Sequence, residues 1–209
     1  MRTSALLADF QILVLLWGGR KSETLSLKWT NIDYGKKIVT FTDTKNGEDH
    51  LFPLAPLAES VLADVRSLLN EWGNQSDFVF PSMRTGHKSQ EKTHIKEPKR
   101  AMEAVAAEAD VPFATHDIRR TFSNLLVSAE VGAEVQFVKL ALNHSQASDV
   151  TSFNYLDKVR TLRPLYEKLE RAILIKVGEK VADKVEINAD EYRQFLEFKA
   201  QSERQAAPQ

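Results

Sequence analysis

Hydrophobic residues recur along most of the chain with the spacing of α-helices. The stretch 6–17 (LLADFQILVLLW) is so densely apolar that it predicts a helix buried around most of its circumference. Apolar positions at helical spacing also fill 57–72. Further helices are expected over about 22–29, 96–109, 115–128 with Thr115 as N-cap, 133–142, and from Pro164 to about Gly178.

A β-hairpin interrupts the helical pattern. Residues 37–42 (KIVTFT) are rich in β-branched and aromatic side chains, and residues 49–54 (DHLFPL) return after the turn sequence DTKNG. The Asn-Gly dipeptide supplies the positive φ angles that a tight hairpin turn requires. Residues 77–81 (DFVFP) predict a short strand or an extended segment. The expected fold class is α+β, mostly α-helical, with a small antiparallel hairpin or sheet on one side.

The composition narrows the class of protein. With 209 residues, the chain suits one domain, or one domain with an appendage, and a composition that is 43% hydrophobic and 27% charged excludes a disordered or collagen-like protein. It has no cysteine, which rules out disulfides, thiolate zinc sites and cysteine nucleophiles. The longest apolar run, 12–17, is too short to cross a bilayer and does not resemble a secretory signal. We therefore expect a cytoplasmic protein without a membrane partner.

Charge is balanced over the whole chain but not locally. The 28 Lys and Arg residues against 29 Asp and Glu give a net charge of −1, which would normally argue against a nucleic acid partner. Between residues 84 and 100, however, six basic residues stand against two acids. The basic residues are Arg84, Lys88, Lys92, Lys96, Lys99 and Arg100. This segment is a candidate DNA-binding loop, with an ordinary solvated loop as an equal alternative.

Several residues along the chain are of types suited to phosphate chemistry. In chain order they are Arg20 with Glu23 after a Gly-Gly turn, Lys45 at the expected hairpin tip, His116 with Arg119 at i,i+3, and His144 followed eleven residues later by Tyr155. Taken singly, each has an ordinary structural explanation as a solvated turn residue, a helix-end residue or a packing residue. Their order and separations make the combination far more specific than any member.

In combination, these residues resemble the catalytic set of the tyrosine recombinases, the phage-integrase family of site-specific DNA recombinases. The matching stretches are GGRKSETLSLKW followed by NID, TKNGEDHLFPL, THDIRRTFSNLL and LNHSQASDVTSFNY. They extend over residues 12–156, nearly the whole catalytic domain of the family. The resemblance implies a prophage-integrase-like catalytic domain over 1–178 and a C-terminal helical extension or tail over 179–209.

The resemblance also implies the role of each matched residue. Tyr155 would attack the scissile phosphate of double-stranded DNA and form a 3′-phosphotyrosyl link. Arg20 and Arg119 would bind the non-bridging oxygens, and Lys45 would protonate the departing 5′-oxygen. This chemistry suits a phosphodiester, because paired guanidiniums can neutralise the charge that accumulates at phosphorus without a metal ion.

The remaining matched residues have supporting roles in the same comparison. His116 and His144 would hydrogen-bond the phosphate, with His116 also helping to deprotonate Tyr155, whose ordinary pKa is near 10. Glu23 would support the active-site arginine or the helix start. No cofactor, metal or ATP is expected, and the sequence has no Walker-type phosphate loop.

The chain departs from the family pattern in a few places. Trp17 stands where a Thr often precedes the first Gly, and Asn143 replaces the more usual Gly before His144. The family usually carries an N-terminal core-binding domain, and this chain begins shortly before the first matched helix, so we expect a truncated protein with weak, salt-sensitive DNA binding. The separation of His144 and Tyr155 favours the integrase branch.

The function expected from these observations is site-specific DNA recombination, as integration or excision, in a bacterial or phage-derived, nucleoid-associated protein. A type IB topoisomerase-like relaxase and a non-catalytic DNA-binding fragment are the alternatives. Leu165, Leu169, Ile173 and Val177 form a narrow apolar stripe. The stripe could dock on a neighbouring protomer of a tetramer on DNA or pack on its own domain, which would leave a monomer possible.

Overall fold

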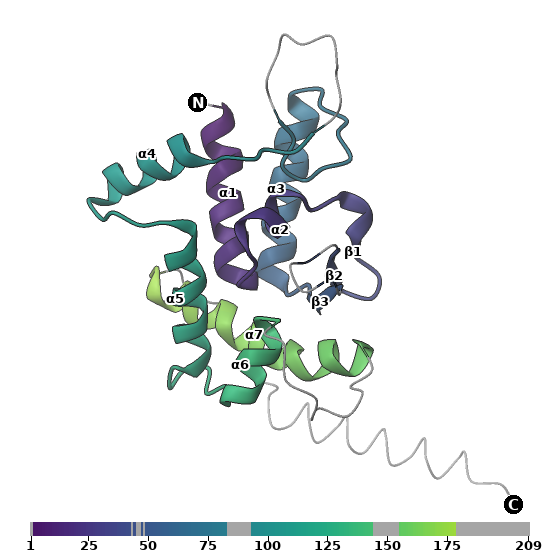
Figure 1. The fold of residues 1–209 in the computed structure, drawn as a ribbon, viewed down its shortest axis with the longest axis vertical. Helices are drawn as coiled ribbons and strands as arrows, with labels where there is room; N and C mark the ends of the chain where they lie inside the picture. The colour runs from purple at the N-terminus through teal and green to yellow at the C-terminus, as the bar shows by residue number, and fades with distance from the viewer. Residues whose placement is uncertain are drawn as a thin grey trace, which may run out of the picture. The chain divides into compact units, whose positions relative to one another are not determined.

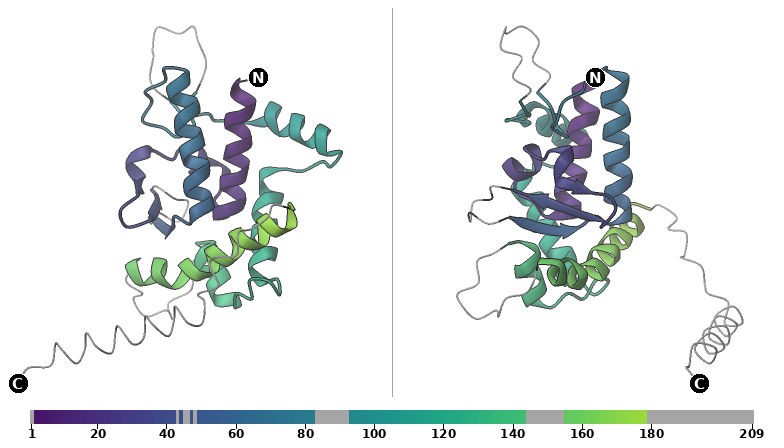
Figure 2. Two further views of the ribbon diagram at one scale, coloured as in Figure 1. Left: turned by 180° about the vertical axis from the view of Figure 1, so that it is seen from behind. Right: turned by 90° about the vertical axis from the view of Figure 1, so that its right-hand side faces the viewer.

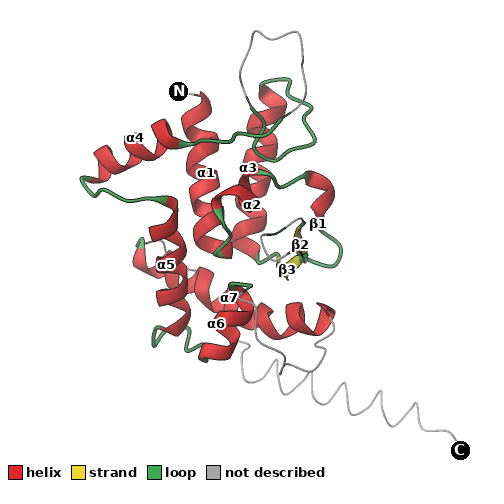
Figure 3. Ribbon diagram, viewed as in Figure 1, coloured by secondary structure: helices red, strands yellow, loops and turns green. Residues whose placement is uncertain are grey.

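The computed structural model describes residues 2–42, 44, 47, 49–82, 93–143 and 155–178. In chain order its elements are α1 (Arg2–Trp17), α2 (Lys21–Leu25), a 3-10 turn (Trp29–Asn31), β1 (Ile32–Asp33), β2 (Ile38–Phe41), β3 (His50–Pro53), α3 (Pro56–Glu71), α4 (Lys99–Ala109), α5 (Thr115–Val127), α6 (Val135–Ala141) and α7 (Tyr155–Lys176). Helices dominate, with one small sheet (Figure 3), so the expected fold class is confirmed. Lys45, Arg84, Lys88, Lys92, His144 and 179–209 lie outside the described residues, as do the side chains of Arg100 and Tyr155.

Helix α1 forms the centre of the core. It packs along α3 on one side and α5 on another, and it also contacts α2 and α4 (Figure 1). Leu6, Phe10 and Leu13 are fully buried. Because neighbours surround α1, its sequence is apolar nearly all round, as the predicted buried helix over 6–17 requires. None of the helices in the described ranges is long and apolar enough to span a membrane.

The three-stranded antiparallel sheet has the order β1-β2-β3. In the hairpin, Val39 pairs with Phe52 and Phe41 pairs with His50. The Phe41 and Phe52 rings lie edge to face with centroids 4.7 Å apart, and both rings pack against Trp17 at the end of α1. The predicted hairpin is confirmed. The two-residue strand β1 was too short for its alternation to be visible in the sequence.

Two consecutive glycines after α1 make the turn that presents Arg20. Gly18 has φ +62°, and a Cβ placed there would lie 2.3 Å from the Phe122 ring. A Cβ on Gly19 would lie 2.6 Å from the Phe41 ring. Only glycine fits both positions, so this turn brings α1, α5 and the sheet into close contact.

Three differences between the expected and the observed helix boundaries matter most. Helix α7 begins at Tyr155 and contains Pro164, which was expected to begin the helix. Pro164 and Arg160 are both exposed, so water can bind the Arg160 carbonyl that the proline leaves without a partner. Helix α2 ends at Leu25, short of the expected residue 29. The segment 77–81 is extended, with single β-bridges only.

The third difference concerns Thr115, which was expected to be the N-cap of its helix. Thr115 is instead the first helical residue, and Ala114 is the N-cap. The Ala114 amide donates to the Asp117 carboxylate at 2.9 Å, and the Thr115 hydroxyl contacts the Met102 sulfur at 2.9 Å. The Thr115 side chain is thus used to join α5 to α4.

Helix α7 packs across the ends of α1 and α3 where these two helices meet the sheet (Figure 2). Leu169 is fully buried, and Leu165 and Ile173 pack against the core, so this part of the apolar stripe packs on its own domain. The chain divides into two compact units, 1–173 and 174–209, and Val177 belongs to the second. The domain boundary expected after residue 178 stays a prediction.

Candidate active site

Arg20 occupies the turn between α1 and α2 and is held by Glu23. The Arg20 amide donates to one carboxylate oxygen of Glu23 at 3.1 Å, and its Nη1 donates to the other at 2.7 Å. The Glu23 side chain is 6% exposed, whereas that of Arg20 is 27% exposed. Glu23 therefore fixes the direction of the Arg20 side chain while part of the guanidinium stays accessible.

Arg119 lies on α5 and joins two chain segments that are distant in sequence. Its Nη1 donates to the carbonyl of Gly18, and its Nη2 donates to the carbonyl of Leu142 at 2.7 Å. Burial lowers the pKa of Arg119, the nearby positive charge of Arg20 lowers it further, and Glu23 acts in the opposite direction. Two guanidiniums that close together form a site suited to a multiply charged anion.

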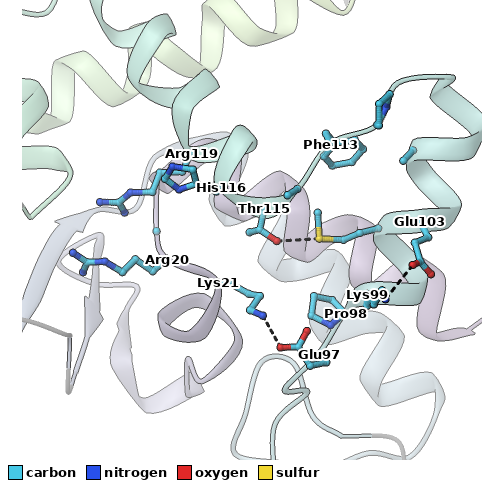
Figure 4. A pocket seen from close by; sticks show the side chains of 15 residues that line it. Arg20, Lys21, Glu97, Pro98, Lys99, Glu103, Phe113, Thr115, His116 and Arg119 are labelled. Carbon is cyan, nitrogen blue, oxygen red and sulfur yellow. Dashed lines mark hydrogen bonds and ion pairs between the residues drawn. The ribbon is translucent and has the colours of Figure 1, made fainter.

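Arg20, His116 and Arg119 line one pocket of about 620 Å³. Figure 4 shows the two guanidiniums extending to the same side, with His116 beside Arg119 on α5. His116 is exposed, which is compatible with contact to a large substrate. The opposite wall of the pocket comes from α4 and the segment before α5, including Met102 and Phe113. Half of the sequence-predicted catalytic set therefore meets at one place.

Thr44 and Asn143, which directly precede Lys45 and His144 in the sequence, contact each other. The Asn143 side-chain amide lies 3.5 Å from the hydroxyl of Thr44, which is buried. Asn143 has φ +50°, in the left-handed region that Asn tolerates better than most residues. This conformation explains physically why Asn stands in a position where the family more often has Gly.

Tyr155 is the first residue of α7, and the charge of a lysine one turn later acts on the same buried residue as the charges of the arginine pair. Lys158, one turn after Tyr155, is 9% exposed. Its charge, together with those of Arg119 and Arg20, acts on the buried His50 of β3. Burial and these three cations lower the pKa of His50 to about 2. The charges of Lys158 in α7 and of both guanidiniums therefore act on one imidazole.

His50 and Lys158 are the site residues that the sequence analysis missed. His50 is 3% exposed, and among the described residues its Nε2 has no hydrogen-bond partner. Its ring packs edge-on against Phe52, with centroids 5.2 Å apart. A histidine at an inward-facing position of a predicted strand was the available signal. Lys158 gave none, because a lysine in a helix is ordinarily exposed.

The described part of the basic segment is less positive than its sequence suggests. Lys99 is paired with Glu103 at 3.7 Å, and Glu97 is paired with Lys21 at 2.6 Å. Lys96 is exposed. The assignment of this segment to DNA binding therefore stays a prediction, with Lys96 as its best-placed described residue.

The comparisons with known proteins agree with this architecture. A helical domain with a small antiparallel sheet and a paired-arginine pocket is the arrangement expected for the catalytic domain of a tyrosine recombinase. Residues 3–160 match the model of the phage integrase family. The chain therefore belongs to the phage integrase family.

Individual relatives place the chain among integrases and recombinases. The prophage integrase IntF of Escherichia coli (strain K12) is 27% identical over 181 residues, which are 86% of this chain and 37% of IntF. The integrase from mycobacterium phage Brujita matches in structure with a TM-score of 0.58 and 17% identity, over 88% of this chain and 55% of that protein. The XerH site-specific recombinase, solved as a pre-cleavage complex with difH substrate, matches with a TM-score of 0.52 and 19% identity, over 82% and 46%. The chain spans less than two thirds of the length of each of these relatives.

Proposed function

We propose that this chain cleaves and rejoins strands of double-stranded DNA as the catalytic domain of a site-specific recombinase that integrates or excises DNA. The observation that carries the proposal is that Arg20, His116 and Arg119 line one pocket, in a domain whose helix α7 begins with Tyr155. Family membership supports the reaction class. The structure of the similarly folded XerH site-specific recombinase bound to its difH substrate supports double-stranded DNA as the partner.

In this proposal the two arginines bind the scissile phosphate. In the free protein burial lowers the pKa of Arg119, and repulsion from the positive charge of Arg20 lowers it further. A phosphodiester relieves the repulsion, and the pentacoordinate transition state relieves it further because it carries one more negative charge. Stabilisation that grows as the charge develops is the kind that accelerates the chemical step.

The covalent step uses Tyr155 as nucleophile and Lys45 as acid. The phenolic oxygen forms a bond to phosphorus while the bond from phosphorus to the 5′-oxygen breaks. The phenol proton passes to His116 or to solvent, and Lys45 gives a proton to the departing 5′-oxygen. The phosphodiester is replaced by a phosphotyrosyl ester of similar energy, so a 5′-hydroxyl can reverse the step without ATP or a metal ion.

A nicked-duplex assay tests the proposal. A library of nicked duplexes with random sequence around the nick traps the covalent intermediate, because the short cleaved fragment diffuses away. We expect wild-type protein to form an adduct that survives denaturing gels, and sequencing of the trapped DNA would reveal the target. Tyr155→Phe should form no adduct. An adduct formed equally well by Tyr155→Phe would disprove the assignment.

The arginine pair has its own expected result in this assay. Arg20→Ala and Arg119→Ala should each slow adduct formation by about 100-fold or more, because each removes a donor that stabilises the transition state. Arg171→Ala removes an exposed arginine of α7 and serves as the control. Recombined products separate a recombinase from a topoisomerase-like relaxase, and DNA binding without any adduct would indicate a non-catalytic fragment.

A further inference from the structure

The anchoring of α7 determines where its first residue, Tyr155, stands. On the described part of the chain, polar contacts of α7 with the core gather on one face of the helix. Arg163 donates to the carbonyl oxygens of Lys36 and Lys37 at 3.2 and 3.0 Å, next to the strand that leads to the hairpin. The Tyr166 hydroxyl lies 3.5 Å from the carbonyl of Trp17, at the end of α1.

The closest of these contacts is made by Glu170. Its two carboxylate oxygens accept hydrogen bonds from the backbone amides of Leu57, at 2.8 Å, and Ala58, at 3.0 Å. Glu170 is 5% exposed, and the residues it joins are more than one hundred positions apart in sequence. This carboxylate therefore caps the N-terminus of α3 from a different helix.

Helix α3 cannot cap itself. Its N-cap is Ala55, which has no side-chain acceptor, and its first residue is Pro56, which has no amide hydrogen. The next two amides are those that Glu170 binds. The positive end of the α3 dipole also favours a carboxylate at this point. Capping of α3 therefore depends on docking of α7. When α7 is released, the Glu170 carboxylate loses the amides of Leu57 and Ala58, and these amides lose their acceptor.

Because Glu170 is buried, loss of its contact with the α3 amides would be costly. Burial raises the pKa of Glu170, and the two amide donors of Leu57 and Ala58 counteract part of this effect. A buried carboxylate of this kind tolerates little displacement, since a shift along α3 would leave both the charge and the amides unpaired. The cap therefore fixes the position of α7 along its own axis.

We propose that Glu170 is a positioning residue for strand cleavage, which it controls by fixing the axial position of α7 and hence of Tyr155. The inference rests on the proposed function. Glu170 is 15 residues after Tyr155, or roughly 22 Å along a continuous helix, so it acts at a distance from the phosphate. A displacement of the nucleophile by about 1 Å can cost about 100-fold in rate.

The test compares Glu170→Gln and Glu170→Ala with wild-type protein on the nicked-duplex library. Single-turnover adduct formation at saturating DNA gives the rate of cleavage, and fluorescence anisotropy gives DNA binding. Val65→Ala, a fully buried truncation in α3, controls for lost stability at matched melting temperature. Arg171→Ala controls for a change of charge beside Glu170.

We expect Glu170→Ala to slow adduct formation by about 10- to 100-fold with DNA binding within about twofold of wild type. A 5′-phosphorothiolate substrate, which has a better leaving group, should not restore the rate, because the defect lies in the nucleophile. Both controls should react at the wild-type rate. Amide hydrogen exchange at Leu57 and Ala58 should accelerate in both Glu170 variants.

Two results would overturn the inference, and they can be told apart. A Glu170→Ala protein that forms adduct as fast as wild type, or only as slowly as Val65→Ala, removes the positioning role and leaves the proposed function standing. A wild-type protein that forms no adduct removes the proposed function, and the positioning role with it.

Discussion

His50 is a buried residue that stays neutral and therefore adds no positive charge to the candidate site. Burial, together with the positive charges of Lys158, Arg119 and Arg20, lowers the pKa of its imidazole to about 2. It is therefore neutral wherever the protein is folded under ordinary conditions. A protonated imidazole at this point would add a further positive charge to a cluster that already holds an arginine pair.

The lowered pKa of His50 predicts acid sensitivity. An unfolded chain protonates His50 near its ordinary pKa of 6.5, whereas the folded protein does so only near 2. The contribution of neutral His50 to the free energy of unfolding is therefore complete above pH 6.5. It is lost as the pH falls, by up to about 1.4 kcal/mol per pH unit. His50→Phe should lose less stability than wild type between pH 7 and pH 5 in urea unfolding. Equal losses in both proteins would contradict the assignment.

The close packing around Gly18 predicts that a side chain at this position destabilises the fold. Gly18→Ala places a Cβ against the Phe122 ring at a positive φ, and it should destabilise the fold by about 2–4 kcal/mol. Gly73→Ala has the same sign of φ with no atom within 4 Å, so it should cost only about 1 kcal/mol. Denaturant unfolding of the two variants separates the clash from the backbone strain. If both variants lose the same free energy of unfolding, the contact of Gly18 with the Phe122 ring does not restrict this position.

Among the secondary-structure elements, helices α1 and α3 pack together with two carboxylates near each other, and this is unfavourable when both are charged. Asp9 on α1 is half-buried, and burial together with the nearby Asp64 of α3 raises its pKa to about 6. The folded protein holds this proton more tightly than the unfolded chain. The charged carboxylate therefore weakens the helix pair at neutral pH, in a region away from the candidate site.

Asp9→Asn should stabilise the protein at pH 7.5 by at most about 1 kcal/mol, because half-exposure screens the effect. The benefit should disappear below pH 4, where Asp9 is protonated in both states. For wild-type Asp9 the sign is the reverse of that for His50: its contribution to stability is present at low pH and is lost as the pH rises through about 6. Melting temperatures of both proteins across this range provide the measurement. An unchanged melting temperature at pH 7.5 would show that the Asp9 charge is already well solvated.

At the scale of the whole molecule, charge distribution matters more than net charge. The chain carries a net charge of −1, so any attraction to DNA must come from local groups. Arg20, Arg119 and the exposed Lys96 are described candidates, whereas Lys21, Lys99 and their acidic partners offset one another. Binding through a few phosphates should be modest in strength and sensitive to salt.

A salt titration tests this distribution. The logarithm of DNA affinity should fall linearly with the logarithm of salt concentration, with a slope of about −0.9 for each phosphate contacted. Lys96→Gln should make the slope less steep by about one, whereas Lys168→Gln, an exposed change on α7, should leave it unchanged. If Lys96→Gln has the same slope as wild type, Lys96 does not contact a DNA phosphate, and the prediction for the 84–100 segment fails at this residue.

Much of the fold follows from local sequence. The apolar density of 6–17 predicts a buried helix, and the Asn-Gly turn between β-rich segments predicts the hairpin; both are present. The start of α7 could not be predicted in this way. A proline ordinarily begins or ends a helix, and only the exposure of Pro164 allows it to lie inside one. Exposure depends on packing with distant segments, which periodicity does not reveal.

The periodic elements and the ordered set of reactive residues can be read from the sequence, because both depend on side-chain type and spacing along one chain. The contacts that those residues make depend on the fold. The fold places the Arg119 guanidinium on the carbonyl oxygens of Gly18 and Leu142, buries His50 where the charge of Lys158 acts on it, and gives α3 its cap from Glu170. The physical reason is that burial, hydrogen bonding and electrostatic effects depend on distances in space, and docking of helices sets those distances between residues far apart in the chain.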